Sequence, residues 1–159
     1  MKKIVRSIDV GYGHTKFVTE SLNGQISCGI FPSIAPIVTN LSLLDAVGSV
    51  DIAKIEIGSI TRVVGKDVAN FTSAISTRIM DDTYSSSDIY MSLTRGAMSY
   101  MGRKNIDILI LGLPVSLYKN NEIRARLTKI MAGFHTISKD LLISHKVQPP
   151  SESALVWVV

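Results

Sequence analysis

The first fifth of the chain alternates between apolar and polar residues in three short segments. Residues 2–10 and 15–20 are separated by a tight turn with two glycines, a residue type that permits positive φ. Asn23-Gly24 then precedes an apolar segment at residues 26–31. Alternation with a period of two is typical of strands, and Asn-Gly is a strong hairpin signal. The pattern predicts a three-stranded antiparallel meander over residues 2–31.

The middle of the chain changes from the period of a strand to that of a helix. Residues 51–64 predict a second hairpin that turns at Gly58-Ser59. A serine-rich stretch then precedes apolar residues spaced as in a helix over 89–101. Residues 106–113 are almost continuously apolar, which predicts a strand buried on both faces. A second helix follows over residues 121–132, so the elements predict an α/β fold with a mixed sheet and flanking helices.

The end of the chain is apolar from residue 154 to residue 159. Residues 134–147 predict another hairpin, Pro149-Pro150 interrupts the chain, and Ser151 is a candidate helix cap. Natural termini are usually polar. We therefore expect a domain over residues 1–150 and, over residues 151–159, the start of a truncated helix that leads to another domain.

Composition narrows the function classes. The chain has 159 residues with 46% hydrophobic and 19% charged residues, which suits one globular domain with a core. The net charge of +4 comes from scattered Lys and Arg, so direct binding of nucleic acid is not expected. One cysteine excludes an internal disulfide, and no apolar run reaches the length of a membrane span. These features predict a cytoplasmic protein that does not bind membranes.

The candidate chemistry lies in the stretch Asp9-Val10-Gly11-Tyr12-Gly13-His14-Thr15-Lys16. A carboxylate ends the first predicted strand, and a glycine turn then leads to a hydroxyl and a lysine. Small residues let backbone N–H groups approach a phosphate, Thr15 adds a donor, and Lys16 adds a positive charge. Asp9 is suited to hold Mg²⁺ through water, because Mg²⁺ gives up its water ligands reluctantly.

This turn differs from the two commoner phosphate loops. No G-x-x-x-x-G-K-[ST] sequence is present, and Lys16 stands where a dinucleotide-binding turn needs its third glycine. The predicted turn also joins two antiparallel strands rather than a strand and a helix. An alternative is an ordinary hairpin with a glycine turn, in which Asp9 only stabilises the turn.

The same stretch resembles the first phosphate motif of the actin, Hsp70 and sugar-kinase superfamily. More narrowly, it resembles the plasmid actin-like ParM/StbA proteins and, within them, protein D of the PRTRC plasmid system. Four further segments are similar to that family in the same order. They are Phe31-Pro32-Ser33-Ile34-Ala35-Pro36, Val64-Gly65-Lys66-Asp67-Val68, Leu93-Thr94-Arg95-Gly96-Ala97 and Gly112-Leu113-Pro114-Val115-Ser116.

The resemblance implies an RNase H-like domain of an actin-type ATPase, which binds ATP and Mg²⁺ between two domains and forms filaments of itself. It implies a role in plasmid segregation or maintenance, with an adaptor protein as a further partner. Asp9 would lie at the Mg²⁺ and Gly11, Tyr12, Gly13, His14, Thr15 and Lys16 at the phosphates. Relatives of this kind often carry Asn where His14 stands.

The resemblance also implies a Gln or Glu just after the last strand of this half, which orients the attacking water. Pro150 occupies the matching position, so Gln148 and Glu152 are the candidates. Either residue could instead be structural, Gln148 at a strand end and Glu152 as a charge in the first turn of a helix.

Only one glycine-acid hairpin is present, whereas these enzymes use two. We therefore expect this half alone to be inactive as an ATPase and to bind ATP weakly. Two other functions remain open at this point: a non-enzymatic protein-interaction module built on the same fold, and a relative of the sugar kinases or Hsp70.

Overall fold

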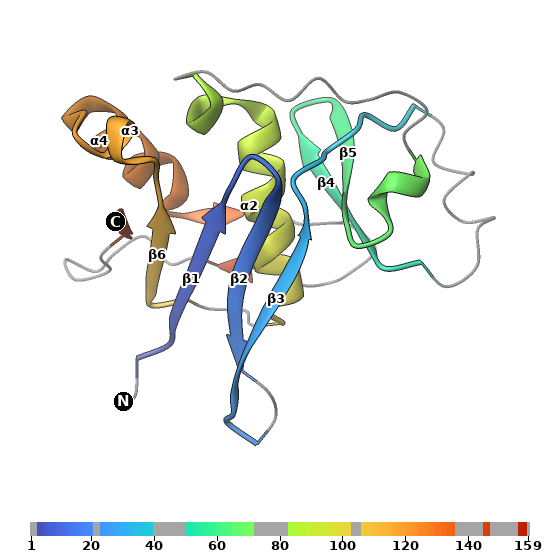
Figure 1. Cartoon of the computed structure of the whole chain (residues 1–159), viewed down its shortest axis with the longest axis horizontal. Helices are drawn as coiled ribbons and strands as arrows, with labels where there is room; N and C mark the ends of the chain where they lie inside the picture. Colours follow the sequence, from blue (N-terminus) through green and yellow to red (C-terminus); the bar gives the residue numbers. More distant parts are fainter. Residues whose placement is uncertain are drawn as a thin grey trace.

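A five-stranded sheet forms the centre of the molecule (Figure 1). The structure is a computed structural model that describes residues 3–20, 23–39, 50–71, 83–102, 106–135, 145–146 and 156–158. The strand order is β3-β2-β1-β6-β9. These strands are β1 (Val5–Val10), β2 (His14–Glu20), β3 (Ile26–Pro32), β6 (Ile108–Gly112) and β9 (Val156–Val158). β1, β2 and β3 are antiparallel in succession, whereas β1, β6 and β9 are parallel, so the predicted mixed α/β sheet is confirmed.

The predicted meander is present, and one contact fixes how its second and third strands pair. Phe17 of β2 lies opposite Gly29 of β3. A Cβ atom on residue 29 would come within 2.1 Å of the Phe17 ring, so the ring occupies the space of the absent side chain. A shift of one residue would turn every side chain of β3 to the other face of the sheet. The Phe17–Gly29 contact therefore opposes slippage of the two strands.

Helix α2 (Asp88–Tyr100) lies between the central sheet and a second hairpin (Figure 1). That hairpin consists of β4 (Ile52–Ile57) and β5 (Ile60–Gly65), as predicted. At Gly96 a Cβ atom would lie 2.2 Å from Cγ2 of Val64, so the helix and β5 can approach this closely only because residue 96 is glycine. α2 is therefore covered by strands on two sides.

The start of α2 is defined by its cap. Two short 3-10 helices, η1 (Val68–Phe71) and η2 (Tyr84–Ser86), precede it in the chain. Oγ of Ser87 accepts a hydrogen bond from the N–H of Tyr90 at 3.1 Å and donates one to the carbonyl of Tyr84 at 2.7 Å. A serine at this position satisfies one of the amides that a helix start leaves unpaired. The cap therefore joins η2 rigidly to the first turn of α2.

The end of the chain differs from the prediction. Residues Val156–Val158 form a strand that pairs in parallel with β6, not the start of a helix. Two of the three residues are valines, which favour strands, and β6 offers an edge with unpaired backbone groups. A six-residue apolar run is too short for periodicity to separate a helix from a buried strand.

The two faces of the sheet are covered unequally, which corrects the prediction for residues 106–113. In β6, Leu109 and Leu111 are buried, whereas Ile108 and Ile110 between them are only half-buried. The buried residues share the face that packs on α2. On the opposite face Val5, Ile26 and Ile30 are exposed. We call this second face the open face of the sheet.

The remaining elements follow β6 in the chain. They are α3 (Val115–Tyr118), α4 (Asn121–Met131) and the short pair β7 (Phe134–His135) and β8 (His145–Lys146). The side chain of Asn120 caps α4, because it accepts hydrogen bonds from the backbone N–H groups of Glu122 and Ile123. The sequence predicts a cap at this position. Of the helices in the described part of the chain, none has the length and apolarity needed to cross a membrane.

Candidate functional site

The turn between β1 and β2 is held by two backbone hydrogen bonds. The N–H of Gly11 donates to the carbonyl of His14 at 3.2 Å, and the N–H of Ser33 donates to the carbonyl of Gly13 at 3.0 Å. Neither glycine of the turn uses the positive φ that glycine permits. Gly11 instead lets the backbone at residue 11 approach the carbonyl oxygen of His14 closely, since a Cβ atom there would lie only 3.1 Å from that oxygen.

The same turn leaves two backbone donors unused. Among the described residues, no hydrogen bond uses the N–H of Tyr12 or of Gly13. A Cβ atom on Gly13 would meet nothing within 4 Å, so this end of the hairpin faces open space. Adjacent free amides in a turn are suited to bind an anion such as a phosphate.

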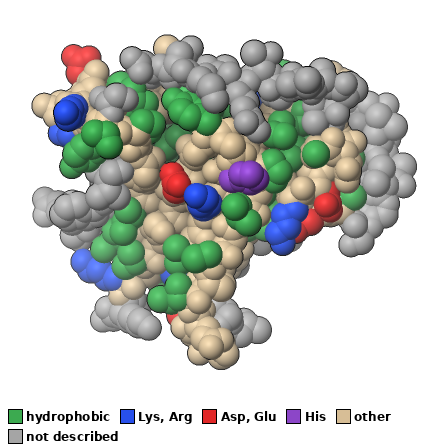
Figure 2. Space-filling view, viewed as in Figure 1, with side chains coloured by type: hydrophobic (Ala, Val, Ile, Leu, Met, Phe, Trp, Pro, Cys, Tyr) green, Lys and Arg blue, Asp and Glu red, His purple; other side chains and the backbone are tan. Residues whose placement is uncertain are grey.

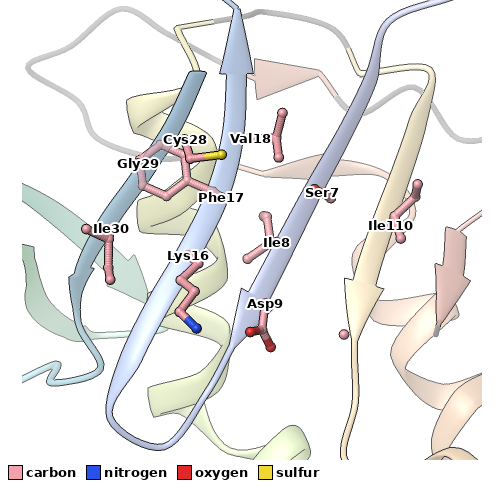
Figure 3. Close-up of a pocket in the computed structure, with 11 residues that line it drawn as sticks. Ser7, Ile8, Asp9, Lys16, Phe17, Val18, Cys28, Gly29, Ile30 and Ile110 are labelled. Atoms are coloured by element: carbon pink, nitrogen blue, oxygen red, sulfur yellow. The ribbon is translucent and has the colours of Figure 1, made fainter. Parts of the chain in front are cut away.

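Asp9 and Lys16 lie beside each other at the end of the open face (Figure 3). They are paired across β1 and β2, and both side chains are exposed. The two groups come from different strands and project from the same side of the sheet. Figure 2 shows an acidic, a basic and a histidine side chain side by side near the middle of the view, and the exposed His14 is the only histidine whose side chain is described.

Gly112 at the end of β6 makes room for the Asp9 carboxylate. Asp9 and Gly112 are register partners in the parallel pair of β1 and β6. A Cβ atom on residue 112 would lie 3.0 Å from Oδ1 of Asp9, closer than ordinary contacts allow. Any side chain at position 112 would therefore displace the Asp9 carboxylate.

Thr15 does not join this group. Its side chain is fully buried on the face toward α2, and its hydroxyl shares a 3.0 Å hydrogen bond with that of Ser33. Because neighbouring strand residues point to opposite faces, Thr15 points away from Lys16. The expectation that the Thr15 hydroxyl reaches a phosphate is wrong for this structure, and its hydrogen bond instead joins β2 to the segment after β3.

Two cavities meet at Asp9 and Gly112. The larger, of about 480 Å³, lies along the open face and is lined by Lys16, Cys28 and Ile110, among others (Figure 3). The smaller, of about 240 Å³, lies on the other side of Asp9. It is bordered by the turn, by the segment after β6, by Tyr84 and Ser85 of η2 and by Tyr90 in the first turn of α2.

Tyrosines connect the turn to the start of α2. The ring of Tyr12 lies 5.2 Å from that of Tyr84, which meets Tyr90 edge to face at 5.7 Å. Burial raises the pKa of Tyr84 to about 12, although a hydrogen bond with Ser33 opposes that increase. Burial, and then the neighbouring Tyr84 and Asp9, raise the pKa of Tyr90 above its usual range. Both phenols are therefore neutral at physiological pH.

The residues present fit a divalent cation bound through water and a phosphate group beside it. Asp9 offers the carboxylate, Lys16 a positive charge, and the amides of Tyr12 and Gly13 two donors. Tyr90 and Ser85 border the smaller cavity, but their hydroxyl oxygens are buried and have no hydrogen-bond partner among the described residues. One carboxylate cannot enclose a cation, and no cluster of three or more His, Cys, Asp or Glu occurs in the described ranges. A water-bound Mg²⁺ next to phosphates needs only one or two carboxylates.

The candidates for orienting water lie outside this group. Gln148 and Glu152 are not among the described residues. They also precede β9, the last strand of the central sheet, rather than following it. The sequence predicts a last strand that ends near residue 147, whereas β9 spans Val156–Val158, so the roles of Gln148 and Glu152 stay predictions.

Sequence reasoning missed the part of the site that comes from other elements. Gly112 was noted only within a segment of family resemblance, Ser85 only within the serine-rich stretch before a helix, and Tyr84 and Tyr90 were not singled out. A signal for Gly112 exists: a glycine that ends a buried strand, followed by Leu-Pro, leaves space at a strand end. No local pattern indicates that Tyr90 faces Asp9.

Comparison with known proteins places the chain in a family. The family described as actin like proteins N terminal domain matches residues 7–148, and the chain belongs to it. No curated protein matches the sequence significantly.

Solved structures share the fold at low sequence identity. The structure of psk41 ParM without ligand superimposes with a TM-score of 0.70 at 15% identity, over 100% of this chain and 50% of that one. AlfA from Bacillus subtilis plasmid pLS32, solved as a filament, has a TM-score of 0.56 at 18% identity over 99% and 55%. Bacillus thuringiensis ParM with ATP has a TM-score of 0.52 at 12% identity over 100% and 44%. The chain thus spans about half the length of these relatives, and the likeness shows an actin-type fold.

Proposed function

We propose that this chain is the N-terminal, phosphate-binding half of an actin-like filament protein that acts in plasmid segregation or maintenance. The observation that carries the proposal is the convergence of Asp9, Lys16 and the free amides of Tyr12 and Gly13 at one end of the open face. Similar proteins support it, because one was solved with ATP and another as a filament. Protein D of the PRTRC systems is the particular relative that the sequence motifs favour.

The residues would act on ATP by position and charge. Lys16 offsets the negative charge of the phosphates, and the amides of Tyr12 and Gly13 donate hydrogen bonds to phosphate oxygens. Asp9 accepts hydrogen bonds from water molecules around a bound Mg²⁺, which in turn neutralises phosphate charge. Hydrolysis further needs a group that orients water, for which Gln148 and Glu152 remain the candidates in this chain.

The experiment is a titration of the ¹⁵N-labelled chain with ATP, once with Mg²⁺ and once with EDTA. We expect weak, millimolar binding that shifts the amide signals of residues 11–16 and is tighter with Mg²⁺. Asp9→Asn keeps the shape of the side chain but removes its charge, so it should abolish the effect of Mg²⁺ while the spectrum stays that of a folded protein. The proposal fails if ATP shifts no signal in the turn, or if Asp9→Asn responds to Mg²⁺ like the wild type.

Polymerisation requires a separate measurement. We expect filaments only from a chain that also carries the second half found in the relatives, because the chain spans about half their length. Pelleting of such a chain with ATP, compared with its Asp9→Asn variant, tests whether the phosphate site controls assembly. Equal pelleting of both proteins would separate filament formation from this site.

A protein-interaction module is the second candidate function. It is favoured by the exposed side chains of Val5, Ile26 and Ile30 on the open face. Exposed apolar side chains that gather on one face often mark interaction surfaces. A chain that shows no response to ATP but a concentration-dependent change in mass would support this alternative instead.

A further inference from the structure

His14 is an exposed histidine at the tip of the hairpin that carries the candidate site. It is the first residue of β2, and its carbonyl accepts the hydrogen bond from Gly11 that closes the turn. Exposed and buried side chains alternate along β2 from His14 to Phe17. Because strand residues two positions apart point to the same face, His14 projects on the open face together with Lys16.

The other anion-binding groups lie on both sides of His14 in the chain. The N–H of Gly13, unused among the described residues, comes directly before it. Lys16 comes two positions later, which is about 6–7 Å along a strand. A phosphate that contacts both the Gly13 amide and the Lys16 ammonium group must therefore lie beside residue 14. The imidazole is a third group for the same anion, and histidine is the side chain whose ordinary charge change falls between about pH 5 and pH 8.

The neighbouring strands bring one charge of each sign to this end of the open face. On β2 the nearest charged residue is Lys16, and on β1 it is Asp9, the register partner of Lys16. β3 has no charged residue: Pro32 lies opposite His14, and Cys28 is the only residue of that strand that can titrate. The two opposite charges offset each other, so an arriving phosphate is the main change in the electrostatic surroundings of the imidazole.

The turn and the helix add no further charge beside His14. Tyr12 is the other titratable residue of the turn, and its ring packs against Tyr84 of η2 with 5.2 Å between the ring centres. Helix α2 contacts β2 on the opposite face, where the buried Thr15 and Phe17 point. Within the described part of the chain, the charges next to the imidazole are thus those of the candidate site itself.

We propose that His14 binds the phosphate in its protonated form, so that the affinity of the site for ATP rises as the pH falls from about 8 to about 6. The inference concerns the regulation of the proposed phosphate site and rests on that proposal. Negative charge beside the imidazole favours its charged form, and the imidazolium then donates a hydrogen bond to a phosphate oxygen. Because linkage is reciprocal, the proton and the nucleotide promote each other's binding.

The test measures ATP affinity by chemical-shift titration of the whole chain with Mg²⁺ at about pH 6 and about pH 8. A unit charge at contact distance in water changes an affinity about fivefold, so wild type should bind about fivefold more tightly at the lower pH. His14→Asn should bind with the weaker affinity at both pH values. His14→Lys should bind with the tighter affinity at both, because a lysine keeps its charge throughout this range.

A matched control separates this effect from other groups that titrate. ATP and the remaining histidines contribute equally to wild type and His14→Asn, so the difference between these two pH profiles is the quantity compared. His135→Asn makes the same substitution on β7, which does not belong to the central sheet, and should keep the pH dependence of wild type.

A second readout follows the proton on His14 itself. The ring signals of His14 are identified by their loss in His14→Asn and are then followed against pH with and without ATP. The midpoint of their change should move to higher pH when ATP is present, because the bound phosphate retains the proton. This movement does not depend on the absolute affinity for ATP.

The outcomes distinguish this inference from the proposed function. If ATP shifts no signal in the turn at either pH, both fail. If wild type and His14→Asn bind ATP with the same pH dependence, or if ATP leaves the midpoint of the His14 signals in place, the pH effect is overturned and the phosphate site stands. Weak binding by His14→Lys at both pH values would show that the shape of the histidine matters rather than its charge, and would also overturn the inference.

Discussion

The two faces of the central sheet come from the same strands but have different neighbours. Toward α2, residues such as Ile8, Leu109 and Leu111 are almost completely buried. On the open face, Asp9, Lys16 and Ile30 are exposed, although each is next in sequence to a buried residue. β1, β2, β3 and β6 thus each contribute one set of residues to the core and the alternate set to the open face that carries the candidate site.

This difference shows how a short chain can hold a charged site without weakening its core. Moving one residue along a strand changes the environment from packed to exposed, so neighbouring substitutions should affect different properties. Changes on the covered face should alter the free energy of unfolding. Changes on the open face should alter the binding of ATP and leave folding largely intact.

The largest expected effect comes from Leu111→Ala, compared with its neighbour Ile110→Ala. Leu111 is fully buried, and such a truncation costs about 2–5 kcal/mol of unfolding free energy. Ile110 borders the open cavity, and its truncation should cost about 1 kcal/mol. Urea unfolding of both variants measures the contrast. Equal losses would mean that the open face is as tightly packed as the covered one.

The next effect concerns the charge of Lys16. Lys16→Gln should weaken ATP binding about tenfold, or about 1.4 kcal/mol, because a charged contact to phosphate is lost. Lys66→Gln is a control with the same change of charge, since Lys66 pairs with Asp51 on the second hairpin. Titrations with Mg-ATP distinguish the two. A similar loss in both variants would indicate only a general effect of net charge.

A smaller effect is expected for Gly112→Ala. The added Cβ atom would lie 3.0 Å from Oδ1 of Asp9 and must displace the carboxylate. The contribution of Mg²⁺ to ATP binding should fall by about threefold to tenfold, which corresponds to about 1 kcal/mol. Gly13→Ala, where a Cβ atom meets nothing, serves as the comparison for folding. Unchanged dependence on Mg²⁺ in Gly112→Ala would contradict the close fit between residue 112 and Asp9.

The smallest expected effect is a loss of folding stability at high pH, which comes from the buried Tyr84. Burial raises the pKa of Tyr84 from an ordinary value of 10.0 to about 12, so the folded state favours the neutral phenol. The stabilisation from this residue is complete below pH 10, and it is lost as the pH rises through 12. Unfolding measured across this range should show a decline that is smaller in Tyr84→Phe. An identical decline in both proteins would assign it to other groups.

The sequence predicts those features that depend on neighbouring residues. Asn23-Gly24 specifies the hairpin of β2 and β3, Ser87 and Asn120 specify where helices begin, and the stretch from Asp9 to Lys16 identifies the candidate site. These signals are local, because each arises from the conformations and hydrogen bonds of a few consecutive residues.

The features that were wrong or missed depend on distant contacts. The terminal apolar run forms a strand because β6 provides an edge to pair with, which no local pattern reveals. Thr15 appears in the sequence as part of a phosphate motif, but its partner is Ser33. Likewise, Gly112 and Tyr90 lie near Asp9 only because β6 pairs with β1 and α2 packs on the sheet.

The parallel pairing of β1 with β6 also has a kinetic consequence. Ile4 and Asp107 hydrogen-bond to each other although they are 103 positions apart, and Asp9 meets Gly112 in the same ladder. The meander over β1–β3 closes only short loops, so it can form early, whereas this ladder must first close a long one. During synthesis, the carboxylate of Asp9 would therefore be exposed on a finished hairpin long before β6 leaves the ribosome. The site is completed late in folding, and the hairpin that carries most of its charge is among the earliest parts to form.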